Sequence, residues 1–452
     1  MMRTTATMRS LLGVLAAACP LAAAAVPTTW TIDLQCRSSL DAGTPAFNLP
    51  YPSSLSSQYV ALDESGGVAI RVVLATAGAT EGIFYGSNAT GGLVLTANNT
   101  SDPVWSTYLD ARNGRLCLAD AGFTGGANVY DTAGTLEHAY PAGGSQGVSG
   151  FSSPTMTNDG AICYRADFGF TGDKIVTDEF VGAARTQTLI ADTFSGDYSY
   201  LFSAHVNDAR QVAANTIPVS GPTRRIVRFE PAGGATTIAE TGATYNSFVN
   251  STDLAQNGDV AFSARRSADS IWEVVRADAT TTTTIADGSN ADIDNTSLAN
   301  FPPVLNANGW VAFRATDSSG ATALWVGDGT DLVKLAEQGQ LVDTDLGPLA
   351  LGFDFGPGTG VQVMNGVIDI NDAGQVAFAA FLENGTIGVF VATPTPPCPA
   401  DLDANGTLNI DDINLFAQAF TSGDLLADLD ANGVLNIDDI NLFAAAFTAG
   451  CP

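Results

Sequence analysis

Carboxylate and amide side chains at the spacing of a calcium-binding loop occur twice near the end of the sequence. The strings DLDANGTLNIDDINLFAQAF (401–420) and DLDANGVLNIDDINLFAAAF (428–447) are nearly identical. Calcium takes oxygen ligands from positions 1, 3, 5, 7, 9 and 12 of a twelve-residue loop, with a glycine at position 6 for the sharp turn. Gly406 and Gly433 occupy position 6. The spacing predicts these ligands, Thr407 and Val434 through their backbone carbonyls: Asp401, Asp403, Asn405, Thr407, Asn409 and Asp412, and Asp428, Asp430, Asn432, Val434, Asn436 and Asp439.

We therefore expect residues 398–452 to fold around two calcium ions, because the clustered carboxylates repel one another without a cation. Aspartate at position 12, in place of the longer glutamate, predicts weaker or more hydrated coordination. An amphipathic segment after each loop predicts a helix. Cys398 and Cys451 bracket the duplication almost symmetrically, and we expect them to form a disulfide. The alternative is a pair of Asp/Asn turns in a solvated acidic tail.

A duplicated loop followed by a helix resembles the type I dockerin family of extracellular bacterial proteins, and the Cys-Pro-Ala-Asp-Leu-Asp opening looks like the dockerin-like tails of secreted planctomycete proteins. The resemblance covers about 55 residues and implies docking to a cohesin-like receptor. It departs from the family at loop positions 10 and 11. Many dockerins carry a small hydroxyl pair there, whereas this chain has Ile410-Asp411 and Ile437-Asp438. Another surface receptor is therefore the alternative partner.

The rest of the chain carries weaker candidates for catalysis. Ser145 lies in a G-x-S-x-G string near His138, but its Pro, Ala and Gly surroundings favour a turn over the strand and helix of a nucleophile elbow. His205 falls in an expected strand, and we interpret it as a packed or surface imidazole. A glycosidase needs two carboxyl groups at a defined separation. Two acidic pairs are candidates for that role: Asp343/Asp345 and Asp292/Asp294.

Three further cysteines and most of the tryptophans are expected in the core. Cys117 and Cys163 occupy the same position in adjacent repeats, which indicates small core residues or a local cross-link; the pairing of Cys36 stays open. The tryptophans in question are Trp105, Trp272, Trp310 and Trp325.

A repeat fills the middle of the chain. An Asn/Asp-rich turn, usually with a glycine, is followed by a short apolar strand seven times, as in LAQNGDVAF (254–262) and LNANGWVAF (305–313). The period is near 50 residues, and each copy contains further Val-, Ile-, Phe- and Thr-rich strands. Four strands per unit, seven times, predict an all-β fold: a seven-bladed β-propeller over residues 26–392, followed by a small α-helical calcium-binding domain. The "NxxGxVAF" signature also resembles uncharacterised propeller-like repeat domains.

The sequence also predicts how the ring closes. The seventh copy ends without its last strand, and residues 28–35 resemble the missing one, so we expect the N-terminal segment to complete the last blade. A long last interval hides an insertion near 337–365, which leaves six or eight blades as alternatives. Residues 393–397, Thr-Pro-Thr-Pro-Pro, are expected to form a stiff linker.

The N-terminus has the layout of a secretory signal peptide over residues 1–25, with Arg3 and Arg9 before an apolar run. We therefore expect a secreted, cell-surface or periplasmic protein without a membrane span. The chain has 18 basic and 47 acidic residues, a formal net charge of −29, and two histidines. This balance argues against nucleic-acid binding, which needs basic patches, and against a histidine-rich metal centre.

These observations favour a non-enzymatic binding or surface-structural protein. The propeller would present a face to a carbohydrate or protein ligand, and the calcium module would attach it. The rival hypothesis is a polysaccharide-degrading hydrolase or lyase tethered in the same way, and a third is a passive spacer. Unpaired, convergent carboxylates from a few blade loops at one mouth of the ring would favour the enzyme, exposed aromatic side chains there would favour binding, and the spacer predicts neither.

Overall fold

The computed structural model describes residues 25–76, 78–87, 90–98, 105–120, 126–141, 150–167, 172–354, 361–362, 364, 366–395, 398–402, 407–429 and 434–450. The expected signal peptide lies outside them except for Ala25, and so do Ser145 and Cys451. Among the described residues, no helix combines the length and hydropathy needed to cross a membrane.

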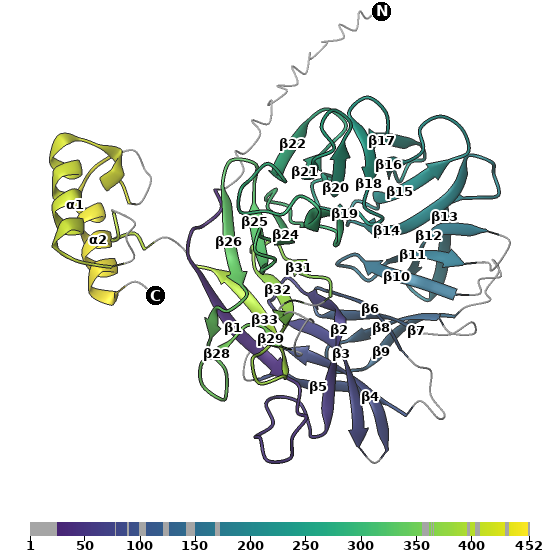
Figure 1. Ribbon diagram of the computed structural model, residues 1–452, viewed down its shortest axis with the longest axis horizontal. Coiled ribbons are helices and arrows are strands. Elements are labelled where there is room, and N and C mark those ends of the chain that lie inside the picture. Colours follow the sequence, from purple (N-terminus) through teal and green to yellow (C-terminus); the bar gives the residue numbers. More distant parts are fainter. Residues whose placement is uncertain are drawn as a thin grey trace, which may run out of the picture.

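Seven antiparallel blades follow one another around a centre (Figure 1), which confirms the seven-bladed propeller. Most have four strands. Blades 1 to 4 contain β2 (Ser53–Leu62), β3 (Val68–Thr76), β4 (Ala79–Gly86) and β5 (Gly92–Ala97); β6 (Trp105–Arg112), β7 (Arg115–Asp120), β8 (Gly126–Asp131) and β9 (Leu136–Pro141); β10 (Gly150–Met156), β11 (Ile162–Asp167), β12 (Asp173–Val181) and β13 (Ala184–Asp192); and β14 (Tyr198–Val206), β15 (Val212–Pro218), β16 (Arg225–Phe229) and β17 (Ala235–Glu240).

The inner strands of the last three blades are short. Blades 5 and 6 contain β18 (Tyr245–Phe248), β19 (Asp253–Leu254), β20 (Val260–Arg266), β21 (Trp272–Ala277) and β22 (Thr282–Asp287); and β23 (Val304–Leu305), β24 (Val311–Thr316), β25 (Thr322–Gly327) and β26 (Leu332–Glu337). A 3-10 turn, η3 (Ser297–Ala299), precedes β23. Blade 7 contains β31 (Asp369–Ile370), β32 (Val376–Phe381) and β33 (Ile387–Pro394).

The N-terminal strand β1 (Trp30–Arg37) pairs antiparallel with β33 and is the outer strand of blade 7, the position expected for residues 28–35. The pairing reaches Trp30 opposite Pro394, so Thr393 and Pro394 belong to the blade. The expected linker is therefore shorter at this end, because β1 holds these residues in the sheet. The expected insertion forms two small hairpins: β27 (Leu341–Val342) with β28 (Leu349–Ala350), and β29 (Phe353–Asp354) with β30 (Val361–Gln362).

Large and small side chains alternate along the second strand of each blade and interlock neighbouring blades. In blade 6, Val311 and Phe313 pack in the same cluster as Ala261 of blade 5, whereas Ala312 packs in the cluster of Val376 and Phe378 of blade 7. The small residue leaves room for the next blade's large ones. Cys117 and Cys163 occupy this small position in blades 2 and 3 as buried free thiols, so the core interpretation is confirmed and the cross-link is wrong.

The signature asparagine links one blade to the next. Asn306 is 2% exposed; its side-chain oxygen accepts the Trp310 N–H at 3.0 Å and its amide donates to the Asn371 carbonyl of blade 7 at 3.1 Å. Asn371 repeats the arrangement toward Asp63 of blade 1. Asn207 repeats it toward blade 5. The glycine of the signature follows from the turn, since Gly374 has a φ of +81° and a Cβ there would lie 2.3 Å from the Trp310 ring.

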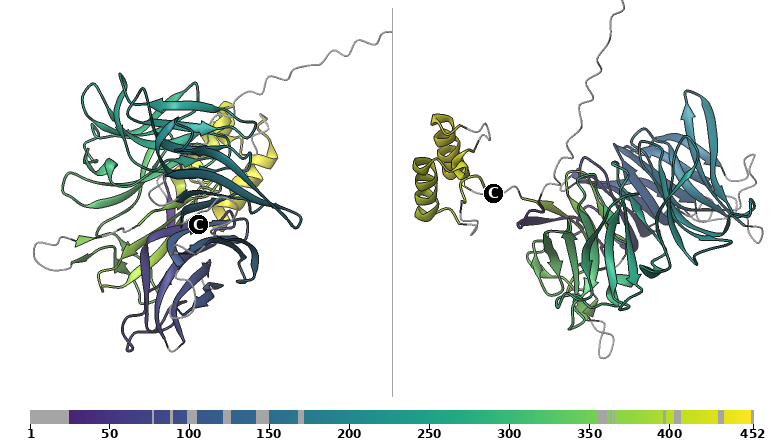
Figure 2. Two further views of the ribbon diagram at one scale, coloured as in Figure 1. Left: turned by 90° about the vertical axis from the view of Figure 1, so that its right-hand side faces the viewer. Right: turned by 90° about the horizontal axis from the view of Figure 1, so that it is seen from above.

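The C-terminal residues form two loop-and-helix units, α1 (Ile410–Ser422) and α2 (Ile437–Ala449), with a 3-10 turn η4 (Leu425–Ala427) between them. Phe416 and Phe443 stack with ring centres 4.2 Å apart and hold the two helices together. Both expected helices are present. Figure 2 shows the pair beside the blades, apart from the ring.

Replacing Asn306 with alanine should lower the free energy of unfolding of the propeller by about 2–4 kcal/mol, because it removes the side-chain acceptor of the buried Trp310 N–H and one of the two donors to the Asn371 carbonyl. Urea unfolding followed by tryptophan fluorescence measures this, since all five tryptophans precede residue 326. The control is Asn257→Ala, which removes an exposed amide that reaches the Ala307 carbonyl of blade 6. Equal losses in the two variants would contradict the role of the buried bridge.

Candidate functional site

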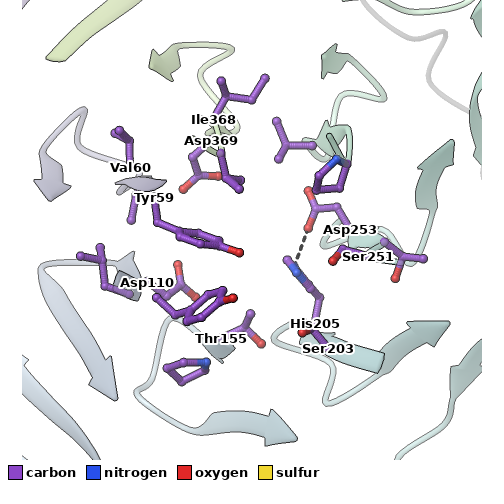
Figure 3. Close-up of a pocket in the computed structure, with 18 of the residues that line it drawn as sticks. Tyr59, Val60, Asp110, Thr155, Ser203, His205, Ser251, Asp253, Ile368 and Asp369 are labelled. Atoms are coloured by element: carbon purple, nitrogen blue, oxygen red, sulfur yellow. Dashed lines mark ion pairs between the residues drawn. The ribbon is translucent and has the colours of Figure 1, made fainter. Parts of the chain in front are cut away.

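A cavity of about 90 Å³ lies in the central channel and is lined by residues from all seven blades (Figure 3). We call its central set the ring residues: in each blade, the inner-strand residue paired with the small residue of the second strand. They are Ala61, Asp110, Thr155, His205, Asp253, Val304 and Asp369. The blade architecture thus brings seven residues about 50 positions apart in the sequence to one pocket.

The polar ring residues also connect the blades. Asp110 accepts the Met156 N–H of blade 3 at 2.7 Å, and Asp253 accepts the Leu305 N–H of blade 6 at 2.7 Å. Asp369 accepts the Leu62 N–H of blade 1 at 2.8 Å. The Thr155 hydroxyl accepts the Val206 N–H of blade 4 at 3.2 Å. These four side chains supply acceptors to backbone groups that face the channel, so they have a structural task as well as lining the pocket.

His205 of blade 4 and Asp253 of the neighbouring blade 5 form a pair at one side of the pocket (Figure 3), with His205 Nδ1 2.8 Å from Asp253 Oδ1. Burial alone would lower the pKa of His205, but the hydrogen bond to Asp253 and the charges of Asp253 and Asp110 raise it above its usual value. Burial would likewise raise the pKa of Asp253, but its hydrogen bond to His205 and the positive charges of His205 and Arg112 lower it. The pair therefore favours imidazolium and carboxylate together.

Arg112 supplies the second positive charge beside the pocket. Its Nε lies 3.6 Å from Asp110 Oδ1, and its Nη1 lies 3.4 Å from Glu64 Oε1. Burial raises the pKa of Asp110 even though Arg112 and two backbone N–H groups oppose the shift. Asp110 and Asp253 thus each have a cationic neighbour.

Asp369 has no ion-pair partner among the residues that the structure describes. Its oxygens accept the Leu62 and Ile370 N–H groups at 2.8 and 2.9 Å. Burial raises the pKa of Asp369 to about 7, and the charges of Asp110 and Asp253 add to the increase, against Arg112 and the Leu62 N–H. This carboxyl group can therefore gain or lose a proton near neutral pH, which an ordinary aspartate cannot.

The residues two positions before the ring residues form a further layer of the pocket lining. Tyr59 and Tyr108 pack with ring centres 4.3 Å apart, and Ser203 and Ser251 continue the layer on the opposite side. Burial raises the pKa of Tyr59, and Tyr108 adds to the shift, so its phenol stays protonated. The pocket thus combines aromatic faces, hydroxyl groups and carboxylate acceptors.

The candidates proposed from sequence inside the propeller lie elsewhere, with one exception. Asp345 pairs with Arg37, which is fully buried, at 2.7 Å. Asp294 accepts N–H groups within its own turn, and His138 stacks on Phe180. Trp105, Trp310 and Trp325 are buried, and Trp272 packs against the core. The exception is His205, which we interpreted as a packed or surface imidazole and which lies in the channel pocket.

The calcium loops are described in part. Asp403, Asn405, Asp430 and Asn432 lie outside the described residues. Asp412 and Asp439 are fully buried, and each caps the start of its helix by accepting the N–H of Asn409 or Asn436. Each also accepts the N–H of loop position 2, Leu402 or Leu429, at 2.9 Å. Thr407 and Val434 lie in the loops. Within the described part of the chain, no three His, Cys, Asp or Glu residues are grouped closely enough to hold a metal ion.

The repeated pattern in the sequence does not single out the ring residues, because its most regular part is the turn that follows them. A signal was present: the fifth residue before the turn's glycine (before Arg210 in blade 4) is apolar in the copies at Ala61 and Val304 but polar at Thr155, His205, Asp253 and Asp369. In blade 2 the turn is one residue shorter, so Asp110 falls out of register when copies are aligned on the glycine.

The stability of the propeller should fall as the pH rises from 4 to 7. In the native state Asp369, with a pKa of about 7, holds its proton over this window, whereas in the unfolded chain it releases the proton. Asp369 therefore lowers the free energy of unfolding by at most about 1.4 kcal/mol for each pH unit. The raised pKa of His205 acts in the same direction above its usual value. Asp369→Asn should reduce the slope, measured by urea unfolding at pH 5 and 7.

The control is Asp278→Asn, because hydrogen bonds from Thr280 and Thr281 lower the pKa of Asp278 to about 2, below the tested window. Identical slopes in the wild type and Asp369→Asn would contradict the assignment of the neutral-pH proton to Asp369.

Comparisons with known proteins give a family and a distant fold likeness. The chain matches no curated protein. Among solved structures, a prolyl endopeptidase aligns at a TM-score of 0.48 and 10% identity over 77% of this chain and 51% of that one. The polysaccharide lyase Uly1 aligns at 0.45 and 9% identity over 82% and 98%. The chain thus spans about half the length of the prolyl endopeptidase, and neither likeness bears on function. The model of a family of unknown function, DUF7453, matches residues 137–399, more than half of the chain, and the protein therefore belongs to that family.

Proposed function

We propose that this protein is a secreted or cell-surface binding protein whose channel pocket takes a small polar ligand and whose C-terminal module attaches it to a surface. The observation that carries the proposal is the ring of polar side chains. Seven blades of similar construction converge on one cavity, and four of the seven ring residues are ionisable. A concave site with a few convergent polar groups is the usual form of a small-molecule site.

The lining favours a hydroxyl-rich ligand such as a single sugar residue or another polyol. Carboxylates of Asp110, Asp253 and Asp369 accept hydrogen bonds from hydroxyl groups, and a carboxylate has capacity beyond its backbone partners. The Tyr59 and Tyr108 rings offer apolar faces to C–H groups. A volume of about 90 Å³ accommodates a small group, not several linked sugars.

For the C-terminal module, the proposal is two calcium ions bound by the twelve loop residues expected from the sequence. Support comes from the loop ends, where Asp412 and Asp439 fold back to accept the N–H of loop position 2. This brings positions 1 and 12 of each loop near each other, as ligands of one ion must be. The Cys398–Cys451 disulfide remains part of the proposal.

The proposed partner of the module is a cohesin-like or other surface receptor. Ile410 and Ile437, at loop position 10 of the two units, are each 63% exposed, and Ile413 and Ile440 are exposed one turn further along. Equivalent apolar side chains on both helices offer a receptor two similar contact surfaces. Apolar residues in place of a hydroxyl pair favour a receptor with an apolar contact surface.

The alternative function is a polysaccharide-degrading hydrolase or lyase. One observation favours it: the channel holds a titratable carboxyl group, Asp369, together with the His205–Asp253 pair, and proton transfer at neutral pH needs such groups. Against it, the carboxylates already accept backbone N–H groups, and the small cavity excludes a polymer chain.

A glycan array and a polysaccharide-hydrolysis screen of the mature protein with calcium should give binding without product release. For a sugar that binds, Asp369→Asn should weaken affinity about 10-fold or more at pH 8, because a hydrogen bond to a charged group is lost. Asp278→Asn, in an exposed turn, is the matched control. Product release that Asp369→Asn abolishes would establish the enzyme instead, and absence of both binding and turnover would overturn the pocket as a sugar site.

Removal of calcium with EDTA should unfold the C-terminal module and leave the blades intact, because the affinity for the metal is part of the module's folding free energy. Hydrogen–deuterium exchange of the full chain separates the two parts. We expect α1 and α2 to lose protection while β20, β24 and β32 keep it. In the double variant Asp412→Asn, Asp439→Asn, α1 and α2 should lack protection even without EDTA, as they do in the wild type when EDTA is present. Protection of α1 and α2 that is insensitive to EDTA would contradict the calcium assignment.

A further inference from the structure

Arg314, on β24 of blade 6, is a buried cation for which no polar partner is found among the residues that the structure describes. The residue is 3% exposed, and its Nε and Nη2 atoms are buried with no hydrogen-bond partner. No ion pair involving Arg314 occurs among the described residues. Burial lowers the pKa of Arg314 to about 9, which leaves the guanidinium charged at neutral pH. An uncompensated buried charge is strongly destabilising, so its retention needs a reason.

Two other blades show what normally satisfies an arginine at this place in the fold. Arg71 pairs with Ile83 across β3 and β4, Arg165 with Ile175 across β11 and β12, and Arg314 with Leu324 across β24 and β25. The three arginines therefore occupy the same position of the second strand in blades 1, 3 and 6.

In the first two sites an acid two residues before the paired position accepts hydrogen bonds from the arginine. Arg71 donates from Nε and Nη2 to Glu81 Oε2 at 2.9 and 2.7 Å, and Arg165 donates from Nη2 to Asp173 at 2.8 Å. The Nε atom of Arg165 is buried and forms no hydrogen bond with the described residues. In blade 6 the equivalent residue is Thr322. Nε and Nη2 of Arg314, which lack a hydrogen-bond partner among the described residues, are thus the same two atoms with which Arg71 binds Glu81 in blade 1. Blade 6 has no acid at the equivalent position.

The surroundings leave the guanidinium close to the surface. The centroid of the Phe301 ring lies 3.3 Å from the guanidinium carbon of Arg314, and the ring covers one face of the guanidinium. Phe301 itself is 37% exposed, so one aromatic ring separates Arg314 from solvent on that side. Phe301 is therefore the side chain that would have to move for a ligand to reach the guanidinium from that side.

We infer that Arg314 binds a small carboxylate from solution, which takes the place of the acid that blades 1 and 3 provide from their own third strands. The Nε and Nη2 edge of a guanidinium matches a carboxylate geometrically, and both hydrogen bonds are charge-assisted. Threonine lacks the terminal carboxylate of glutamate, so the ligand class is a monocarboxylate of the size of formate or acetate. The site is separate from the channel pocket and goes beyond the proposed function.

The test compares thermal unfolding in sodium acetate and in sodium chloride at constant ionic strength, with the full chain and calcium present. Wild-type protein should gain a few degrees in Tm in acetate. Arg314→Met, which keeps the apolar stem, should show no acetate response. Thr322→Glu restores the missing acid and should raise the Tm in chloride by a similar amount while abolishing the acetate response. Thr322→Val adds no charge, so its Tm should rise in acetate as the wild-type Tm does.

An acetate response that persists in Arg314→Met would overturn the inference, and so would the absence of any response in the wild type. A crystal structure grown in acetate gives an independent reading if Thr322→Glu fails to fold. Planar density on the Nε and Nη2 edge of Arg314 supports the site, and water alone there contradicts it. None of these outcomes bears on the channel pocket, which Arg314 does not line.

Discussion

The inner edge of every blade ends at the channel, where its backbone N–H and C=O groups have no further strand to pair with. Buried polar groups without partners are costly, so a closed ring of blades needs side chains that reach from one blade to the backbone of the next. Asn207, Asn306 and Asn371 supply amides for this purpose, and the polar ring residues supply acceptors. The arrangement of the channel follows from this requirement.

The same requirement explains which parts of the repeat are constant. The signature asparagine closes its own turn and crosses to the neighbouring blade, while the following Val-Ala-Phe strand interlocks large residues with a small one across the interface. The small strand position has little freedom, since it is alanine or cysteine in every blade, whereas asparagine occupies the turn position in blades 4, 6 and 7. The ring position has more freedom, because an alanine, a valine or a polar acceptor all fit there. Variation between blades is therefore concentrated where the scaffold tolerates it, as Arg314 and Thr322 also illustrate on the second and third strands of blade 6.

The sequence was sufficient for the fold and insufficient for the site, for physical reasons. Turn chemistry and strand composition are local, so the blade count and the pairing of β1 with β33 could be predicted. The channel pocket depends on register across seven interfaces. The one-residue difference in the turn of blade 2 hides Asp110, and the inward-facing His205 stands out only when the repeat copies are aligned with one another, not from its neighbours in the chain. The acidic pairs chosen for their proximity in sequence proved to serve other contacts, as Asp345 does with Arg37.

The central claim is that the ring residues both close the propeller and form its binding pocket. Native-state hydrogen exchange of the Leu62, Met156 and Leu305 amides tests it most directly, because each donates to a ring carboxylate of the preceding blade. The account predicts that these amides exchange only through global unfolding and become more protected when a ligand occupies the channel. Rapid exchange through local opening, or protection that a bound ligand leaves unchanged, would contradict it.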